Sequence, residues 1–113
     1  MRKFLVLVLL AVPATALADR APNSSERAAI KAAAKSSSQT QGAGKFKVEH
    51  IRVSTVGPWA RATLDPKSDS LDTAVAVFKA HGYGGYKLKE LGTAQVGCDI
   101  VPKKVAADLS LGC

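Results

Sequence analysis

The stretch "KFKVEHIRVSTVGPWARATL", residues 45–64, carries the pattern that decides the fold. Its apolar and polar side chains alternate, which is the two-residue period of a β-strand with one buried face. The phase slips at His50 and is resumed by Ile51 and Val53, so the sequence predicts a β-bulge at His50. A glycine–proline pair then turns the chain, and residues 59–64 pair back as the second strand of a hairpin.

A second hairpin follows the first. Residues 73–81 ("TAVAVFKAH") predict a third strand, the "GYGG" stretch predicts a tight turn, and residues 86–92 ("YKLKELG") predict a fourth strand. Pro102 then suits the first turn of a short helix that carries Val105 and Leu109 on one face.

A capped helix is predicted before the sheet. Asn23 is a favourable N-cap residue, and Glu26 stands three positions later, where its carboxylate can reach back to the backbone amide of the cap. The helix is expected from about Ser24 to Lys35, with a thin face of alanines around one isoleucine. The polar and glycine-containing residues 36–44 predict a flexible connection to the sheet.

The first residues have the pattern of a secretory signal peptide. Arg2 and Lys3 precede an apolar run that is too short to span a membrane as a mature helix, and small residues end at Ala18. We expect residues 1–18 to be removed, which leaves residues 19–113 as a single α+β domain that is secreted or periplasmic. The chain has 16 Lys and Arg against 9 Asp and Glu, a net charge of +7, which permits a negatively charged partner.

The two cysteines, Cys98 and Cys113, predict a disulfide within the chain. In an oxidising compartment cysteines this close in sequence pair, and closing the loop stabilises a small domain by about 3 kcal/mol. A CxxC redox pair is absent, and a zinc site needs further ligands. A disulfide between two chains stays the alternative. The predicted fold class is α+β: an N-terminal helix packed on a four-stranded antiparallel sheet, with a short C-terminal helix tied by the disulfide.

The segments "GPWARATL" (57–64) and "GGYKLKELG" (84–92), with a helix laid across an antiparallel sheet, resemble the cystatin-like domains, in particular small secreted bacterial ones. The resemblance implies a helix on a curved sheet over most of the mature chain. Papain inhibitors of that class use a glutamine-x-valine-x-glycine loop and a proline–tryptophan loop. Here "QVG" (95–97) is two residues shorter, and the proline–tryptophan pair lies in the first hairpin. Both departures argue against protease inhibition, which stays an alternative.

His50 and His81 are the candidates for proton transfer in an enzyme. No serine, cysteine or carboxylate lies at a spacing that predicts a nucleophile, a base and an orienting group. Catalysis would need a tertiary contact with a carboxylate such as Asp65 or Asp99. A small hydrolase that uses His50 or His81 is therefore an alternative, and no catalytic residue is assigned.

Two loops resemble ligand sites only in composition. Asp65, Asp69 and Asp72 could bind calcium, but their spacing lacks the glycine and the terminal bidentate glutamate of the known calcium loop. The glycine-rich "HGYGGYK" opens a strand, whereas a phosphate-binding loop opens a helix. We therefore predict that the aspartate stretch is a solvated loop and that the glycine-rich stretch is a hairpin turn. We expect the protein to bind no metal and no cofactor.

Two sets of surface residues are candidates for binding. Strand periodicity places two pairs of lysines on the sheet. If the two pairs meet across the sheet, they form a cationic, anion-binding surface that faces away from the helix. These residues are Lys45, Lys47, Lys87 and Lys89. Three aromatic residues predict a contact platform for sugar or peptide, with core packing as the alternative for the single tryptophan. They are Trp59, Tyr83 and Tyr86.

These patterns favour a secreted, non-enzymatic binding or accessory module over an enzyme. The outward positions beside the fourth-strand lysines are not aromatic, so no specific nucleic-acid binding is expected. The predicted partner is an anionic polymer or a membrane surface of the cell envelope, and the protein is expected to be a monomer.

Overall fold

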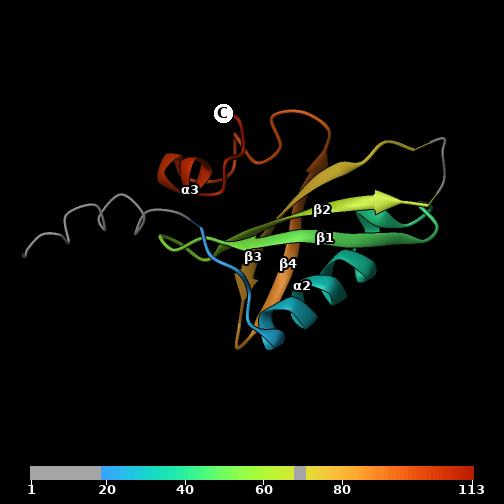
Figure 1. The fold of residues 1–113 in the computed structure, drawn as a ribbon, viewed down its shortest axis with the longest axis horizontal. Helices are drawn as coiled ribbons and strands as arrows, with labels where there is room; N and C mark the ends of the chain where they lie inside the picture. Colours follow the sequence, from blue (N-terminus) through green and yellow to red (C-terminus); the bar gives the residue numbers. More distant parts are fainter. Residues whose placement is uncertain (1–18, 68–70) are drawn as a thin grey trace, which may run out of the picture.

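The structure is a computed structural model that describes residues 19–67 and 71–113. A long helix lies on one face of a four-stranded antiparallel sheet, and a short helix lies on the other face (Figure 1). The elements are α2 (Ser24–Ser36), the 3-10 helix η3 (Ser38–Thr40), β1 (Phe46–Val53), β2 (Trp59–Pro66), β3 (Ala74–His81), β4 (Gly85–Gly92) and α3 (Lys103–Asp108). The predicted α+β fold is confirmed. The predicted signal peptide, residues 1–18, lies outside the described residues.

Helix α2 begins with the predicted capping box. The backbone amide of Glu26 donates to the side-chain oxygen of Asn23 at 2.8 Å, and the backbone amide of Asn23 donates to the Glu26 carboxylate at 3.0 Å. Ile30, Ala33 and Ala34 are buried on the face that packs on the sheet. The small side chains let the helix lie close to the strands.

The connection after α2 is more ordered than the sequence predicts. Thr40 is buried, and its hydroxyl donates to the backbone carbonyl of Ala34 at 2.6 Å. The side-chain oxygen of Ser37 accepts from the backbone amide of Gln39 at 3.1 Å. Because these local hydrogen bonds fix η3, the expectation of a flexible connection over residues 36–44 is wrong for its first half.

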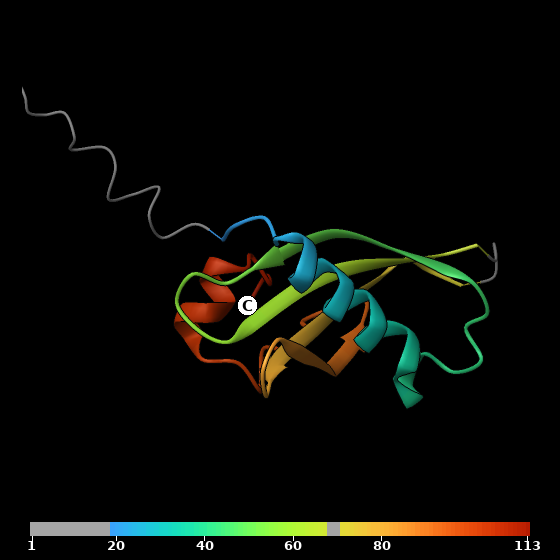
Figure 2. The same ribbon diagram turned by 90° about the horizontal axis from the view of Figure 1, so that it is seen from below.

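The four strands form an antiparallel meander in the order β1, β2, β3, β4. A register shift between Glu49 and Arg52 confirms the predicted bulge, and His50 within it has a left-handed backbone with φ of 51°. A second register shift leaves Lys89 without a paired residue on β3. Both edge strands contact α2, so the sheet curves around the helix (Figure 2).

Two apolar cores lie on opposite faces of the sheet. Adjacent residues of β3 show the division, because Phe78 belongs to the core beneath α2 and Val77 to the core beneath the C-terminal segment, residues 93–113. The helix-side core consists of Ile30, Ala33, Ala34, Ile51, Val53, Ala60, Ala62, Leu64, Ala76, Phe78 and Leu88. The C-terminal core consists of Trp59, Val77, Val96, Val101, Val105, Ala106, Leu109 and Leu111. Packed side chains therefore fill the space between α2 and the sheet.

Candidate anion-binding site

Cys98 and Cys113 form a disulfide within the chain, with 5.6 Å between their Cα atoms. The predicted intramolecular bond is confirmed, and neither cysteine is a free thiol. Such bonds are typical of proteins that fold in an oxidising, extracellular-type environment. Both cysteines of this chain are therefore used in one covalent bond.

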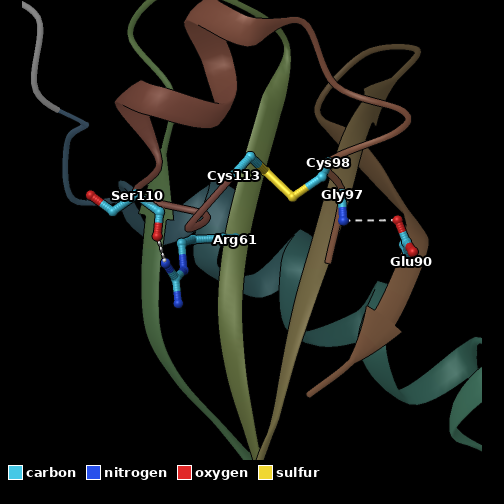
Figure 3. The surroundings of a disulfide bond; sticks show 6 residues. All are labelled: Arg61, Glu90, Gly97, Cys98, Ser110 and Cys113. Carbon is cyan, nitrogen blue, oxygen red and sulfur yellow. Dashed lines mark hydrogen bonds between the residues drawn. A yellow bond between two sulfur atoms is a disulfide. The ribbon is translucent and has the colours of Figure 1, made fainter. Parts of the chain in front are cut away.

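The disulfide closes a loop within the C-terminal segment, which lies over the sheet face opposite α2 (Figure 3). The backbone amide of Gly97 donates to the Glu90 carboxylate at 2.8 Å, and the Arg61 guanidinium donates to the carbonyl of Ser110 at 2.8 Å (Figure 3). Gly97 has φ of 83°, and a Cβ there would lie 3.0 Å from the Val77 side chain, so only glycine fits. The segment thus covers part of the face that was expected to be an open cationic surface.

The two arginines near the first hairpin are bound within the protein. Arg52 donates from Nε to the Asp19 carboxylate at 2.9 Å and from its terminal nitrogen to the Asp19 carbonyl at 3.0 Å. Arg61 donates to the carbonyls of Leu109 at 3.0 Å and Ser110 at 2.8 Å. Both guanidinium groups therefore hold chain segments on the sheet.

Asp108 is a buried carboxylate that the sequence analysis did not single out. One of its oxygens, Oδ2, accepts from the Ser54 hydroxyl and from the Thr55 backbone amide, both at 2.7 Å. The other, Oδ1, is buried without a hydrogen-bond partner among the described residues. Asp108 ends α3 and ties it to the β1–β2 turn. The signal in the sequence is a carboxylate three residues after Val105, on the apolar face of a short helix.

The start of the described chain lies beside the same turn. Arg20 and Val53 exchange backbone hydrogen bonds at 2.9 and 2.8 Å. Helix α3 packs against the turn: a Cβ at Gly57 would lie only 2.9 Å from the side chain of Val105. Trp59 is buried at the end of the turn and is not an exposed contact residue. Protease inhibition stays an untested alternative.

The two histidines lie on the surface, and the described part of the chain pairs neither of them with a catalytic partner. His50 is exposed at the β1 bulge, and His81 is exposed at the end of β3. Among the described residues neither imidazole makes a side-chain hydrogen bond or an ion pair, and neither lines any of five hollows in this part of the chain. Asp65, a candidate partner, accepts from the Thr73 hydroxyl at 3.4 Å.

The three aromatic residues do not share a surface. Trp59 lies in the C-terminal core, with the Lys79 ammonium 5.4 Å from its ring centre. Tyr86 packs against the core on the other face, where burial, with a contribution from the Glu26 carboxylate, raises the pKa of its hydroxyl. Tyr83 is fully exposed at the β3–β4 turn. Trp59 therefore has the core-packing role that was the alternative to an aromatic platform.

The two lysine pairs lie on the two edge strands of the sheet. Lys47 lies in β1 with Lys45 just before it, and Lys87 and Lys89 lie in β4, so β2 and β3 separate the pairs. Lys87 lines a hollow of about 340 Å³ beside the serines that follow α2. The pairs therefore face different surroundings and do not form one surface.

Lys45 and Lys47 take part in a larger group of lysines. A hollow of about 710 Å³ lies where the end of α2, the residues after η3, the start of β1 and the residue after β2 meet. We call it the basic hollow; it is lined by Lys35, Thr40, Gln41, Gly42, Gly44, Lys45, Phe46, Lys47 and Lys67. Among the described residues no carboxylate lines it, and none forms an ion pair with its lysines.

Two of these four lysines were not assigned to a site from the sequence. Lys35 lies in the last turn of α2, and Lys67 follows β2, where its backbone amide donates to the Lys45 carbonyl at 3.0 Å. Lys67 lies beside Lys45 because β2 extends to Pro66, opposite Phe46, whereas the predicted second strand ended at residue 64. The position of Lys35 depends on how α2 packs, and no local pattern in the sequence encodes that.

No group of three or more metal-ligating side chains lies within the described ranges, and Asp69 of the candidate calcium loop lies outside them. None of the helices in residues 19–67 and 71–113 has the length and apolar character needed to cross a membrane. No protein-family model, curated protein or solved structure matches this chain. The resemblance to cystatin-like domains therefore stays a prediction.

Proposed function

We propose that the protein is a non-enzymatic binding module that acts outside the cytoplasm and holds an anionic polymer of the cell envelope in the basic hollow. The observation that carries the proposal is one hollow that, among the described residues, is lined by four lysines and by no carboxylate; the lysines are Lys35, Lys45, Lys47 and Lys67. A concave surface of one charge sign concentrates the electrostatic field and attracts the opposite charge. Four lysines around one hollow offer several ammonium groups to successive charges of a polymer.

Two features support a location outside the cytoplasm. The disulfide between Cys98 and Cys113 persists in oxidising compartments and is rare in reducing ones. Residues 1–18 have the basic start, apolar run and small-residue end of a signal peptide. The proposed protein is exported, cleaved near Ala18 and oxidised before it binds.

Binding to inorganic polyphosphate tests the proposal. We expect polyphosphate to bind at low salt and the affinity to fall steeply as the salt concentration rises. Each phosphate that a lysine neutralises releases a counterion, and added salt screens the attraction. The affinity is measured by isothermal titration calorimetry at a series of salt concentrations.

Paired variants locate the site. Lys45→Gln with Lys47→Gln removes two charges from the basic hollow, and Lys87→Gln with Lys89→Gln removes the same charge from the opposite edge of the sheet. We expect the first variant to bind polyphosphate about tenfold more weakly, which is about 1.4 kcal/mol, and the second to bind as the parent does. Equal losses in both variants would contradict a defined site, as would no binding at low salt. Binding to anionic vesicles without binding to polyphosphate would point to a membrane surface.

A further inference from the structure

An apolar hollow of about 280 Å³ lies beside the basic hollow. Its apolar wall includes Phe46 at the start of β1, Leu64 near the end of β2 and Leu91 near the end of β4. Leu64 is buried in the helix-side core, and Phe46 and Leu91 pack against that core. The hollow is thus the open end of the helix-side core.

The apolar and basic hollows share part of their walls. Thr40 and Phe46 line both of them. Asp72 is the one charged residue among the described residues that line the apolar hollow, and it is exposed at the surface. One ligand can therefore occupy the apolar hollow and, beyond Phe46, also reach the lysines of the basic hollow.

Leu71 gives a second reason to expect a ligand here. It lines the apolar hollow and is 44% exposed, one of few large apolar side chains in the described chain that are exposed to this degree. An apolar chain in the hollow would remove the Leu71 side chain from water. This is favourable because exposed apolar surface has a free-energy cost of hydration that burial removes.

We infer that the two hollows together bind a single-chain anionic amphiphile, with its hydrocarbon chain in the apolar hollow and its head group among the lysines. The small volume of the apolar hollow favours one chain over two. The lysines match a phosphate or carboxylate head group by charge. The inference rests on the proposed function, because the head group occupies the same basic hollow as the polymer.

The test uses lauryl phosphate as the probe, kept below its critical micelle concentration. Two matched ligands separate its parts: inorganic phosphate has the charge without the chain, and monolaurin has the chain without the charge. We expect lauryl phosphate to bind at least about tenfold more tightly than either one, because it fills both hollows at once. Isothermal titration calorimetry gives the affinities, and NMR shifts of the Leu71 methyl groups report occupation of the apolar hollow.

Ala43→Phe separates this inference from the proposed function. Ala43 lines the apolar hollow but not the basic one, and it lies in the connection before β1. We expect the larger side chain to weaken lauryl phosphate binding about tenfold and to leave polyphosphate binding unchanged. Leu71→Ser, a surface change at the same hollow, is the second variant if Ala43→Phe does not fold.

The remaining outcomes each decide between the two ideas. Polyphosphate binding together with lauryl phosphate no tighter than inorganic phosphate would overturn the amphiphile and keep the polymer site. Unchanged lauryl phosphate affinity in Ala43→Phe would also overturn the amphiphile, as would equal binding of monolaurin. Lauryl phosphate binding that Ala43→Phe weakens, without polyphosphate binding, would overturn the polymer and keep the amphiphile. No binding of either probe would overturn both.

Discussion

At the scale of single residues, Asp108 connects two parts of the protein that lie far apart in sequence. Its carboxylate accepts from Ser54 and Thr55 in the β1–β2 turn. Asp108→Ala leaves these two donors without their acceptor, and we expect the free energy of unfolding to fall by about 1–3 kcal/mol. Urea unfolding measures the change. Asp99→Ala, an exposed carboxylate in the same segment, is the control and should be nearly neutral; equal effects would show that Asp108 has no special role.

Glu26 makes a second residue-level contribution, and it depends on pH. A hydrogen bond from Arg20 lowers the pKa of the Glu26 carboxyl below its usual value. Because the folded-state pKa is lowered, the ion pair stabilises the protein fully at neutral pH and is lost as the pH falls through that pKa. Arg20 is half exposed, so the contribution is small.

Glu26→Gln tests this dependence, since glutamine can still serve in a capping box. We expect the parent to be more stable than the variant by about 0.5 kcal/mol at neutral pH, and the difference to vanish once the pH has fallen through the lowered pKa of Glu26. Thermal unfolding across this pH range measures the difference. Glu49→Gln, at a carboxylate without an ion pair among the described residues, is the control. A difference that persists at low pH would contradict the ion-pair explanation.

At the scale of elements, local patterns were enough to predict most of the fold. The cap at Asn23, the phase slip at His50 and the "GYGG" turn each act over a few residues, and the structure has a helix start, a bulge and a hairpin at these positions. The bulge at Lys89 was missed, because Leu88 and Leu91 alone do not reveal which residue of β4 lacks a partner on β3.

The packing of α2 on the sheet gives a prediction at this scale. Ala34 has no exposed surface, whereas Ala32 on the same helix is exposed. Ala34→Leu forces extra volume into the helix-side core, and we expect it to destabilise the protein by about 1–3 kcal/mol. Ala32→Leu makes the same change in helix propensity at the surface and should be nearly neutral. Guanidinium unfolding of the two variants compares them, and equal stability would show that α2 packs loosely.

At the scale of the whole molecule, the sequence could not predict how segments far apart in the chain pack together. The sequence pattern of "GCDIVPKKVAADLSLGC" predicted a helix and a disulfide, but not that this segment covers the sheet face opposite α2. The basic hollow depends on the same kind of information, because Lys35 reaches it only through the position of α2. Docking of this kind depends on shape and side-chain volume across several elements, which no short pattern encodes.

Substitution of both cysteines tests how much the stability of the protein depends on the disulfide bond. We expect Cys98→Ser with Cys113→Ser to lower the free energy of unfolding by about 2–4 kcal/mol, because the unfolded chain gains freedom. Trp59 lies in the C-terminal core, so a loosened segment should shift its fluorescence to longer wavelength. An unchanged free energy of unfolding would mean that apolar packing and hydrogen bonds hold the segment without the covalent bond.

The β3–β4 turn lies at the opposite end of the strands from the basic hollow. Gly82 and Gly84 have φ of 64° and 74°, nothing lies within 4 Å of a Cβ built at either one, and Tyr83 between them is fully exposed. Exposed hairpin tips of this kind tolerate inserted sequence. An epitope or a fluorescent label placed beside Tyr83 would therefore make the protein visible in living cells while both of its hollows stay unobstructed.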